Sequence, residues 1–208
     1  MAMGNQYKSI MLTGWLLAIS ALLGTALMVL VNWHSEPYIK YNERQVLLRS
    51  LNTVIPVGSY NNDILNDSTQ VFSRELLGSS EPSIIYRARK SGKPVAAALS
   101  VTAPNGYGGP IILLIGIDYS GKITGVRVVK HRETPGLGDS IEIQRSNWIE
   151  IFTGKTRYNP GESGWRVKRD GGEFDQFTGA TITPRAIVAA VHKALIYYEQ
   201  NRELLFKE

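Results

Sequence analysis

The chain has 208 residues, of which 43% are hydrophobic and 20% are charged, and its formal net charge is +5. This length suits one membrane anchor and one domain with a core of its own. Because the chain contains no cysteine, disulfides, thiolate catalysis and cysteine-bound zinc or iron–sulfur clusters are excluded. The positive charge would suit a nucleic acid, an anionic lipid or an acidic partner, but no nucleic-acid motif accompanies it, so we expect no nucleic-acid partner.

The first feature along the chain is an uncharged apolar run from Ile10 to Val31. At about 1.5 Å per residue, a helix of this length crosses a hydrocarbon core of about 30 Å. Trp15 and Trp33 lie near its ends, where amphipathic rings favour the headgroup level. We therefore predict a tail over residues 1–9 and a retained transmembrane helix over 10–33. A cleaved signal peptide is the alternative, although the run lacks a closing small-x-small site. Basic residues on both sides leave the orientation undecided.

The segment from 34 to 58 is predicted to be a helix that connects the membrane to the domain, because apolar residues recur at helical spacing before Pro56. The next segment, Asn61 to Ser80, is rich in Asn, Asp and Ser, which predicts a loop with a helical turn near Val71 to Leu77.

Residues 59–208 are predicted to form one α+β domain with a mainly antiparallel sheet and flanking helices. Four apolar runs in sequence indicate a meander of strands, joined in pairs at Ser91-Gly92 and Ser120-Gly121. The expected strands are Ser83–Arg89, Pro94–Thr102, Pro110–Asp118 and Lys122–His131. A helix over Ile141–Phe152 and a short strand over Trp165–Lys168 follow.

The last helix has the clearest sequence pattern. Thr183 is a candidate N-cap, and Pro184 suits the first helical position. Apolar residues then recur on one helical face at Ile187, Val191, Leu195 and Tyr198.

Directly before that helix, the segment from Asp175 to Thr183 reads Asp-Gln-Phe-Thr-Gly-Ala-Thr-Ile-Thr. Three hydroxyls, those of Thr178, Thr181 and Thr183, surround the small residues Gly179 and Ala180. A helix N-terminus presents unpaired N–H groups and the positive end of its dipole, so a phosphate could bind here. On these grounds alone, we would prefer an ordinary tight turn with a threonine cap.

Asp175-x-x-Thr178-Gly179-Ala180-Thr181 resembles the acceptor signature of proteins that the ApbE-type flavin transferase modifies. The resemblance implies that Thr181 carries FMN through a phosphoester bond. A second motif begins at His131 and contains Glu133, Thr134, Pro135, Gly136, Leu137 and Gly138. It resembles the second signature of FMN-binding domains in Rnf and Na⁺-translocating NADH:quinone reductase complexes. Together the two motifs predict a flavin site formed by residues 133–138 and by 175, 178–181 and 183.

The resemblance covers nearly the whole chain and is nearest to the RnfG family, with the C subunit of the sodium-pumping quinone reductase as the alternative. It implies a single-pass protein of the bacterial inner membrane with a periplasmic domain. Its expected partners are the other subunits of an Rnf-type complex, the flavin transferase and the lipid membrane. The complex would couple electron transfer between ferredoxin and NAD to ion translocation, and no side chain of this subunit need act as a catalyst.

Two rival functions lack such a signature. A cofactor-free assembly subunit would use both glycine motifs only as turns, and a hydrolase would need a nucleophile elbow or a metal-binding histidine pair, which the sequence lacks. No metal is expected, because His34, His131 and His192 are far apart. The basic cluster Arg166, Lys168 and Arg169 is either a solvated face or a countercharge to the flavin.

Overall fold

The computed structural model describes residues 2–207, except for the side chains of residues 2–10, 12, 13, 37 and 40. The chain divides into two compact units, one that ends at Val46 and one that begins at Leu47. Helix α1 (Ala2–Val54) belongs to both, so the expected span and the expected connecting segment form one continuous helix. The predicted boundaries at residues 9, 33 and 58 remain predictions, and Met1 of the predicted tail lies outside the described residues.

The first unit is a helix, and the apolar side chains that the structure describes in it are not covered by protein. Leu22 and Met28, for example, are 70% and 75% exposed. Ser20 and Thr25 direct their hydroxyls to the backbone carbonyls of Leu17 and Ala21, which satisfies both donors inside the helix. Within the described residues, α1 alone is long and apolar enough to cross a membrane.

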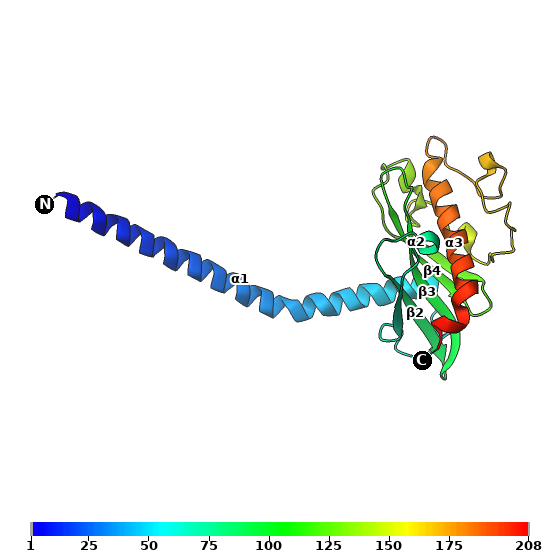
Figure 1. Ribbon diagram of the computed structural model, residues 1–208, viewed down its shortest axis with the longest axis horizontal. Helices are drawn as coiled ribbons and strands as arrows, with labels where there is room; N and C mark the ends of the chain where they lie inside the picture. The colour runs from blue at the N-terminus through cyan, green and yellow to red at the C-terminus, as the bar shows by residue number, and fades with distance from the viewer. Residues whose placement is uncertain (1, 208) are drawn as a thin grey trace. The chain divides into compact units, whose positions relative to one another are not determined.

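The second unit contains a five-stranded antiparallel sheet in the order β1-β2-β3-β4-β5 (Figure 1). Its strands are β1 (Ser68–Val71), β2 (Ser83–Lys90), β3 (Lys93–Ala103), β4 (Ile111–Asp118) and β5 (Ile123–Lys130). The four predicted strands are confirmed, as is the α+β class. Strand β1 was not predicted, because its residues Ser-Thr-Gln-Val carry little apolar pattern. The helical turn expected nearby is α2 (Arg74–Leu77).

One face of the sheet is covered by α2 and by the long helix α3 (Ile182–Leu205), which lies across β3 and β4 (Figure 1). Alternate residues of β4 point into this core. The fully buried members of β4 on this face are Ile111, Leu113, Ile115 and Ile117. They meet the predicted apolar stripe of α3, so the period of two in the strand and the period near 3.6 in the helix share one core.

The other face of the sheet receives the last turns of α1. Leu51 and Val54 are buried there, together with Ala96, Ala98 and Leu114 of the sheet. Two glycines permit the close approach of helix and sheet: a Cβ on Gly116 would lie 2.2 Å from the Val54 carbonyl oxygen, and one on Gly125 would lie 3.1 Å from the Val54 Cα. Thr124 donates its hydroxyl to that same carbonyl, so the end of α1 is fixed to β4 and β5.

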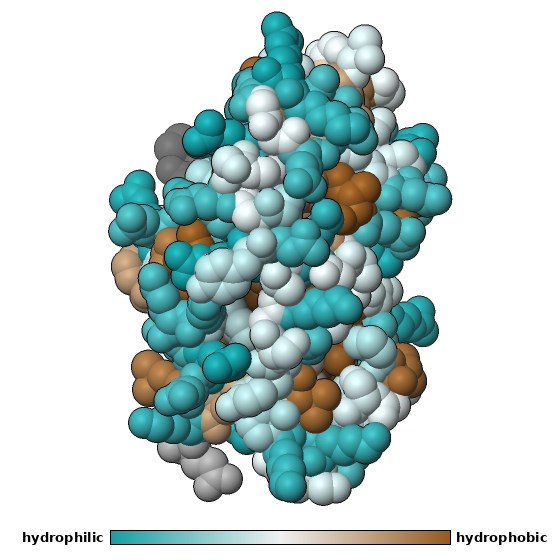
Figure 2. Space-filling model, turned by 90° about the vertical axis from the view of Figure 1, so that its right-hand side faces the viewer, coloured by the Kyte–Doolittle hydropathy of each residue, from teal (hydrophilic) through white to brown (hydrophobic). Residues whose placement is uncertain are grey.

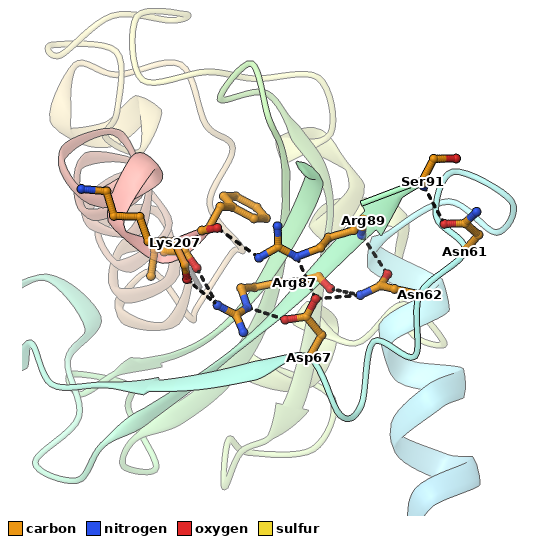
Figure 3. A network of polar contacts seen from close by, with 9 residues as sticks. Asn61, Asn62, Asp67, Arg87, Arg89, Ser91 and Lys207 are labelled. Carbon is orange, nitrogen blue, oxygen red and sulfur yellow. Dashed lines mark hydrogen bonds and ion pairs between the residues drawn. The ribbon is translucent and has the colours of Figure 1, made fainter. Parts of the chain in front are cut away.

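The end of α3 is held by a polar network on β2 (Figure 3). Asp67 pairs with Arg87 at 2.6 Å and with Arg89 at 2.9 Å. The two guanidinium groups also donate to carbonyls at the end of α3 and just after it, those of Leu205, Phe206 and Lys207. Because the final carbonyls of a helix lack partners within the helix, these arginines satisfy and stabilise its C-terminus.

Two predicted elements were wrong. The helix expected over 141–152 is instead two 3-10 turns, Gly138–Ile141 and Asn147–Phe152. Ser146 separates them, because its hydroxyl donates to the Ser140 carbonyl and accepts from the Trp148 N–H, which competes with a continuous helix. The strand expected over 165–168 is reduced to one bridge between Val167 and Phe174.

The surface that carries the loops between residues 153 and 175 is mostly hydrophilic (Figure 2). Hydrophobic residues on this face form small separate patches and not one continuous area. Under these loops, Phe152, Trp165 and Phe174 pack ring against ring, with centroids 4.9 to 6.3 Å apart. An aromatic cluster therefore supports this long irregular segment in place of regular secondary structure.

Candidate functional site

A pocket of about 270 Å³ lies at the N-terminus of α3. Both sequence motifs contribute to it, although they are far apart in the chain. The predicted site residues that line it are Glu133, Thr134, Leu137, Gly138, Gly179, Ala180, Thr181 and Thr183. The fold thus brings the two motifs to one place.

The turn before α3 is held in a defined conformation. Gly179 has a φ of 81°, a left-handed value that favours glycine, and the Ala180 N–H closes the turn on the Phe177 carbonyl. Trp148 contacts the residues just before the turn. Its indole N–H donates to the Asp175 carbonyl at 2.8 Å, and its ring packs edge-on against that of Phe177. The backbone that leads to Thr181 is therefore fixed to the aromatic core.

Thr181 occupies the N-cap position of α3 and is half-buried in the pocket. Its side chain makes no capping hydrogen bond. The next two residues, Ile182 and Thr183, begin a helix of 24 residues, whose first N–H groups have no partner within the helix. A threonine hydroxyl without a cap bond therefore lies beside the positive end of a long helix dipole.

Thr183 is not the N-cap that the sequence predicted. The helix begins one residue before it, and the Thr183 side chain is fully buried. Its hydroxyl donates to the Glu133 carboxylate instead of to the backbone of its own helix. Pro184 is tolerated there because the first turn of a helix needs no N–H from it.

Glu133 is a buried carboxylate that joins three segments. One oxygen accepts from the Thr183 hydroxyl, and the other accepts from the Gly108 N–H at 2.9 Å. The Glu133 N–H donates to His131 Nδ1 at 3.0 Å, and His131 Nε2 lies 2.7 Å from Glu142. This carboxylate therefore ties the β3–β4 loop and the end of β5 to the start of α3.

The second motif forms a tight loop. The N–H groups of Leu137 and Gly138 both donate to the Thr134 carbonyl, and Gly136 has a left-handed φ of 77°. Gly138 is buried, and a Cβ there would lie 2.8 Å from a Glu133 oxygen and 3.1 Å from the Thr183 hydroxyl. Glycine at 138 is needed for close approach, whereas glycine at 136 serves the turn.

Four predicted site residues do not line the pocket: Asp175, Thr178, Pro135 and Gly136. Asp175 is exposed and pairs with Lys168 at 2.7 Å. Arg166 and Arg169, the other members of the basic cluster, are also exposed and do not line it. Their part in holding a ligand remains a prediction.

Two pocket residues were missed by the sequence reasoning, Tyr107 and Ile182. They are 70% and 46% exposed, and Leu137 beside them is 47% exposed. Together these three form an apolar rim around the pocket. An aromatic residue in the glycine-rich segment Asn105–Gly109 was the available signal for Tyr107.

The pocket suits a ligand with an anionic end and a flat apolar part. The helix N-terminus favours an anion, and the apolar rim offers contact to a planar ring. Its volume falls just below the usual range for small-molecule pockets, about 300–1,000 Å³, so a nucleotide-sized ligand would be enclosed only in part. Within the described residues, no cluster of His, Asp or Glu could hold a metal ion.

The chain thus combines an apolar N-terminal helix that is long enough to cross a membrane with an α+β domain that contains a pocket. Residues 106–196 match the FMN-binding domain family, and residues 1–54 match the RnfG N-terminal region. In Photorhabdus laumondii, the G subunit of the ion-translocating oxidoreductase complex is 50% identical over 192 residues, which cover 92% of this chain and 91% of the relative. Its counterpart in Pseudomonas aeruginosa is 46% identical over 198 residues, which cover 95% and 92%.

The chain therefore belongs to the RnfG family, the G subunits of ion-translocating oxidoreductase complexes. Its second unit contains an FMN-binding domain. Its apolar helix and the family name are consistent with a protein of the inner membrane.

Proposed function

We propose that this chain carries FMN covalently on Thr181 and passes electrons within an Rnf-type complex. The observation that carries the proposal is the position of Thr181: its hydroxyl makes no cap bond, and it lies in the pocket within the segment that matches the FMN-binding domain. The bond would be a phosphoester between the threonine oxygen and the FMN phosphate, formed by a flavin transferase. Thr181 is an attachment point and takes no part in turnover.

Different residues around Thr181 would bind the phosphate and the ring of FMN. The N–H groups at the start of α3 would bind the phosphate, because they are unpaired within the helix and lie at its positive end. Tyr107, Leu137 and Ile182 would give the ring an apolar surface. Glu133 would position these elements, since its two oxygens accept from Gly108 and Thr183.

Bound FMN supplies one- and two-electron redox chemistry, while the protein supplies position and electrostatics. By family membership, the complex would couple electron flow between ferredoxin and NAD to ion translocation, and the domain would lie on the periplasmic side. The partial enclosure of the pocket suits this role, because an electron must reach a neighbouring protein of the complex. Covalent attachment retains a cofactor that such a shallow site would otherwise lose.

The attachment is tested by producing the full-length chain together with a flavin transferase and viewing a denaturing gel under ultraviolet light. Wild type should give a fluorescent band, Thr181→Ala should be dark, and Thr181→Ser should regain fluorescence. Thr153→Ala is the matched control, because Thr153 is an exposed threonine outside both motifs and outside the pocket. A fluorescent Thr181→Ala band would overturn the assignment.

A further inference from the structure

A second hollow, a groove of about 680 Å³, lies next to the pocket that contains Thr181, which we call the flavin pocket. Its walls come from the ends of β3 and β5, the start of β4 and the segment after α2. Arg132 lines this groove, and the next residue, Glu133, lines the flavin pocket. The end of β5 is therefore a shared wall between the two sites.

The groove has an excess of positive charge. Arg74, Lys130 and Arg132 line it, and Glu81 is the carboxylate among its lining residues. All three cations are exposed, and among the described residues none of them has a carboxylate partner. Elsewhere in the domain, by contrast, Arg87, Arg89, Arg157 and Arg185 are each paired with an aspartate or glutamate.

The shape and the remaining lining residues favour a peptide segment over a small anion. The groove is larger than the flavin pocket, so a single phosphate would fill little of it. Pro104, Pro110 and Ile112 add apolar surface between the cations. Carboxylates at the rim and aliphatic groups on the floor would match both features, since charge complementarity selects and orients a partner.

We propose that this groove is the docking site for an acidic segment of another subunit of the complex. A partner held here would lie beside the wall that carries Glu133, and so beside the flavin pocket. The inference rests on the proposed membership in an Rnf-type complex, but it is independent of flavin attachment. Gel fluorescence therefore reports on the attachment, and docking is measured separately.

The test introduces a photo-activated cross-linking residue at Thr102, which lines the groove, into the full-length chain in the purified complex. After illumination, mass spectrometry should identify a peptide of another subunit with at least two Asp or Glu residues near the linked position. A cross-link to lipid, to a neutral or basic peptide, or to nothing would overturn the proposal.

A charge-reversal variant gives the second arm. Arg74→Glu, Lys130→Glu and Arg132→Glu together should reduce the Thr102 cross-link about tenfold or more, because attraction becomes repulsion. Lys93→Glu, Lys122→Glu and Lys193→Glu form the matched control, since these exposed lysines change the net charge equally but do not line the groove. Both variants should keep the wild-type melting temperature and gel fluorescence. Equal loss of the cross-link in both would contradict a specific site.

Discussion

Replacing Gly138 with alanine should destabilise the domain far more than the same change at Gly136, two residues earlier in the loop. A Cβ on Gly138 would lie 2.8 Å from a Glu133 oxygen, 2.9 Å from the Glu133 Cβ and 3.1 Å from the Thr183 hydroxyl. These distances force the buried carboxylate away from its two donors. A Cβ on Gly136 meets nothing within 4 Å, so only the left-handed φ opposes the change.

The magnitudes follow from these contacts. Overpacking in a core costs about 1–3 kcal/mol, and weakened hydrogen bonds to a buried charge cost about 1.5–3 kcal/mol. We therefore expect a loss of about 3 kcal/mol for Gly138→Ala. A left-handed non-glycine residue costs about 1 kcal/mol, which sets the value for Gly136→Ala. At about 2–4 °C per kcal/mol for a domain of this length, the melting temperatures should fall by about 6–12 °C and about 2–4 °C.

The assay is thermal unfolding of the detergent-solubilised full-length chain, followed by the fluorescence of the buried tryptophans of the domain. Both variants retain Thr181 and should stay covalently flavinylated when folded. Equal shifts for the two variants, or a larger shift for Gly136→Ala, would refute the role of Gly138 as a site of close approach to Glu133.

Three further predictions concern other parts of the molecule. Asp67→Asn should lower the melting temperature, because two largely buried arginines lose their countercharge and the free energy of unfolding falls by about 2–3 kcal/mol. Asp170→Asn removes a charge from an exposed pair and should change the melting temperature little. Burial lowers the pKa of His192 below the ordinary value of 6.5, so the folded state favours the neutral imidazole. The stabilising contribution of neutral His192 is complete above pH 6.5 and is lost as the pH falls below 6.5. The variant His192→Gln should therefore lose less stability than wild type between about pH 7.5 and 5.5. Because we propose a periplasmic domain, an alkaline phosphatase fused after Glu208 should be active and a green fluorescent fusion should be dark, and the opposite pattern would reject this orientation.

The sheet was predictable from sequence because its strands carry strong local signals. Apolar runs were separated by Ser91-Gly92 and Ser120-Gly121, and both pairs lie at hairpin turns. Strand β1 has no such pattern and forms only because it pairs with β2 and places Asp67 beside two arginines. Its existence therefore depends on contacts distant in sequence.

The two site motifs were found by resemblance, but the contacts that their residues make were not predictable in the same way. Nothing local in the sequence indicates that Thr183 turns to Glu133 in place of capping its helix. Tyr107 had a local signal in its glycine-rich segment, but the neighbouring Gly108 N–H bonds to Glu133, a residue distant in sequence that lines the same pocket. The contacts within the site therefore depend on hydrogen bonds to Glu133 from residues distant in sequence, which local sequence patterns do not indicate.

The most direct test of covalent attachment is mass spectrometry of the flavinylated full-length chain after trypsin digestion. The peptide from Asp170 to Arg185 contains Thr178, Thr181 and Thr183, so one fragment spectrum distinguishes the three hydroxyls. We predict that this peptide is heavier by the mass of FMN less one water, and that the added mass maps to Thr181. An unmodified peptide, or the added mass on Thr178 or Thr183, would contradict covalent attachment at Thr181.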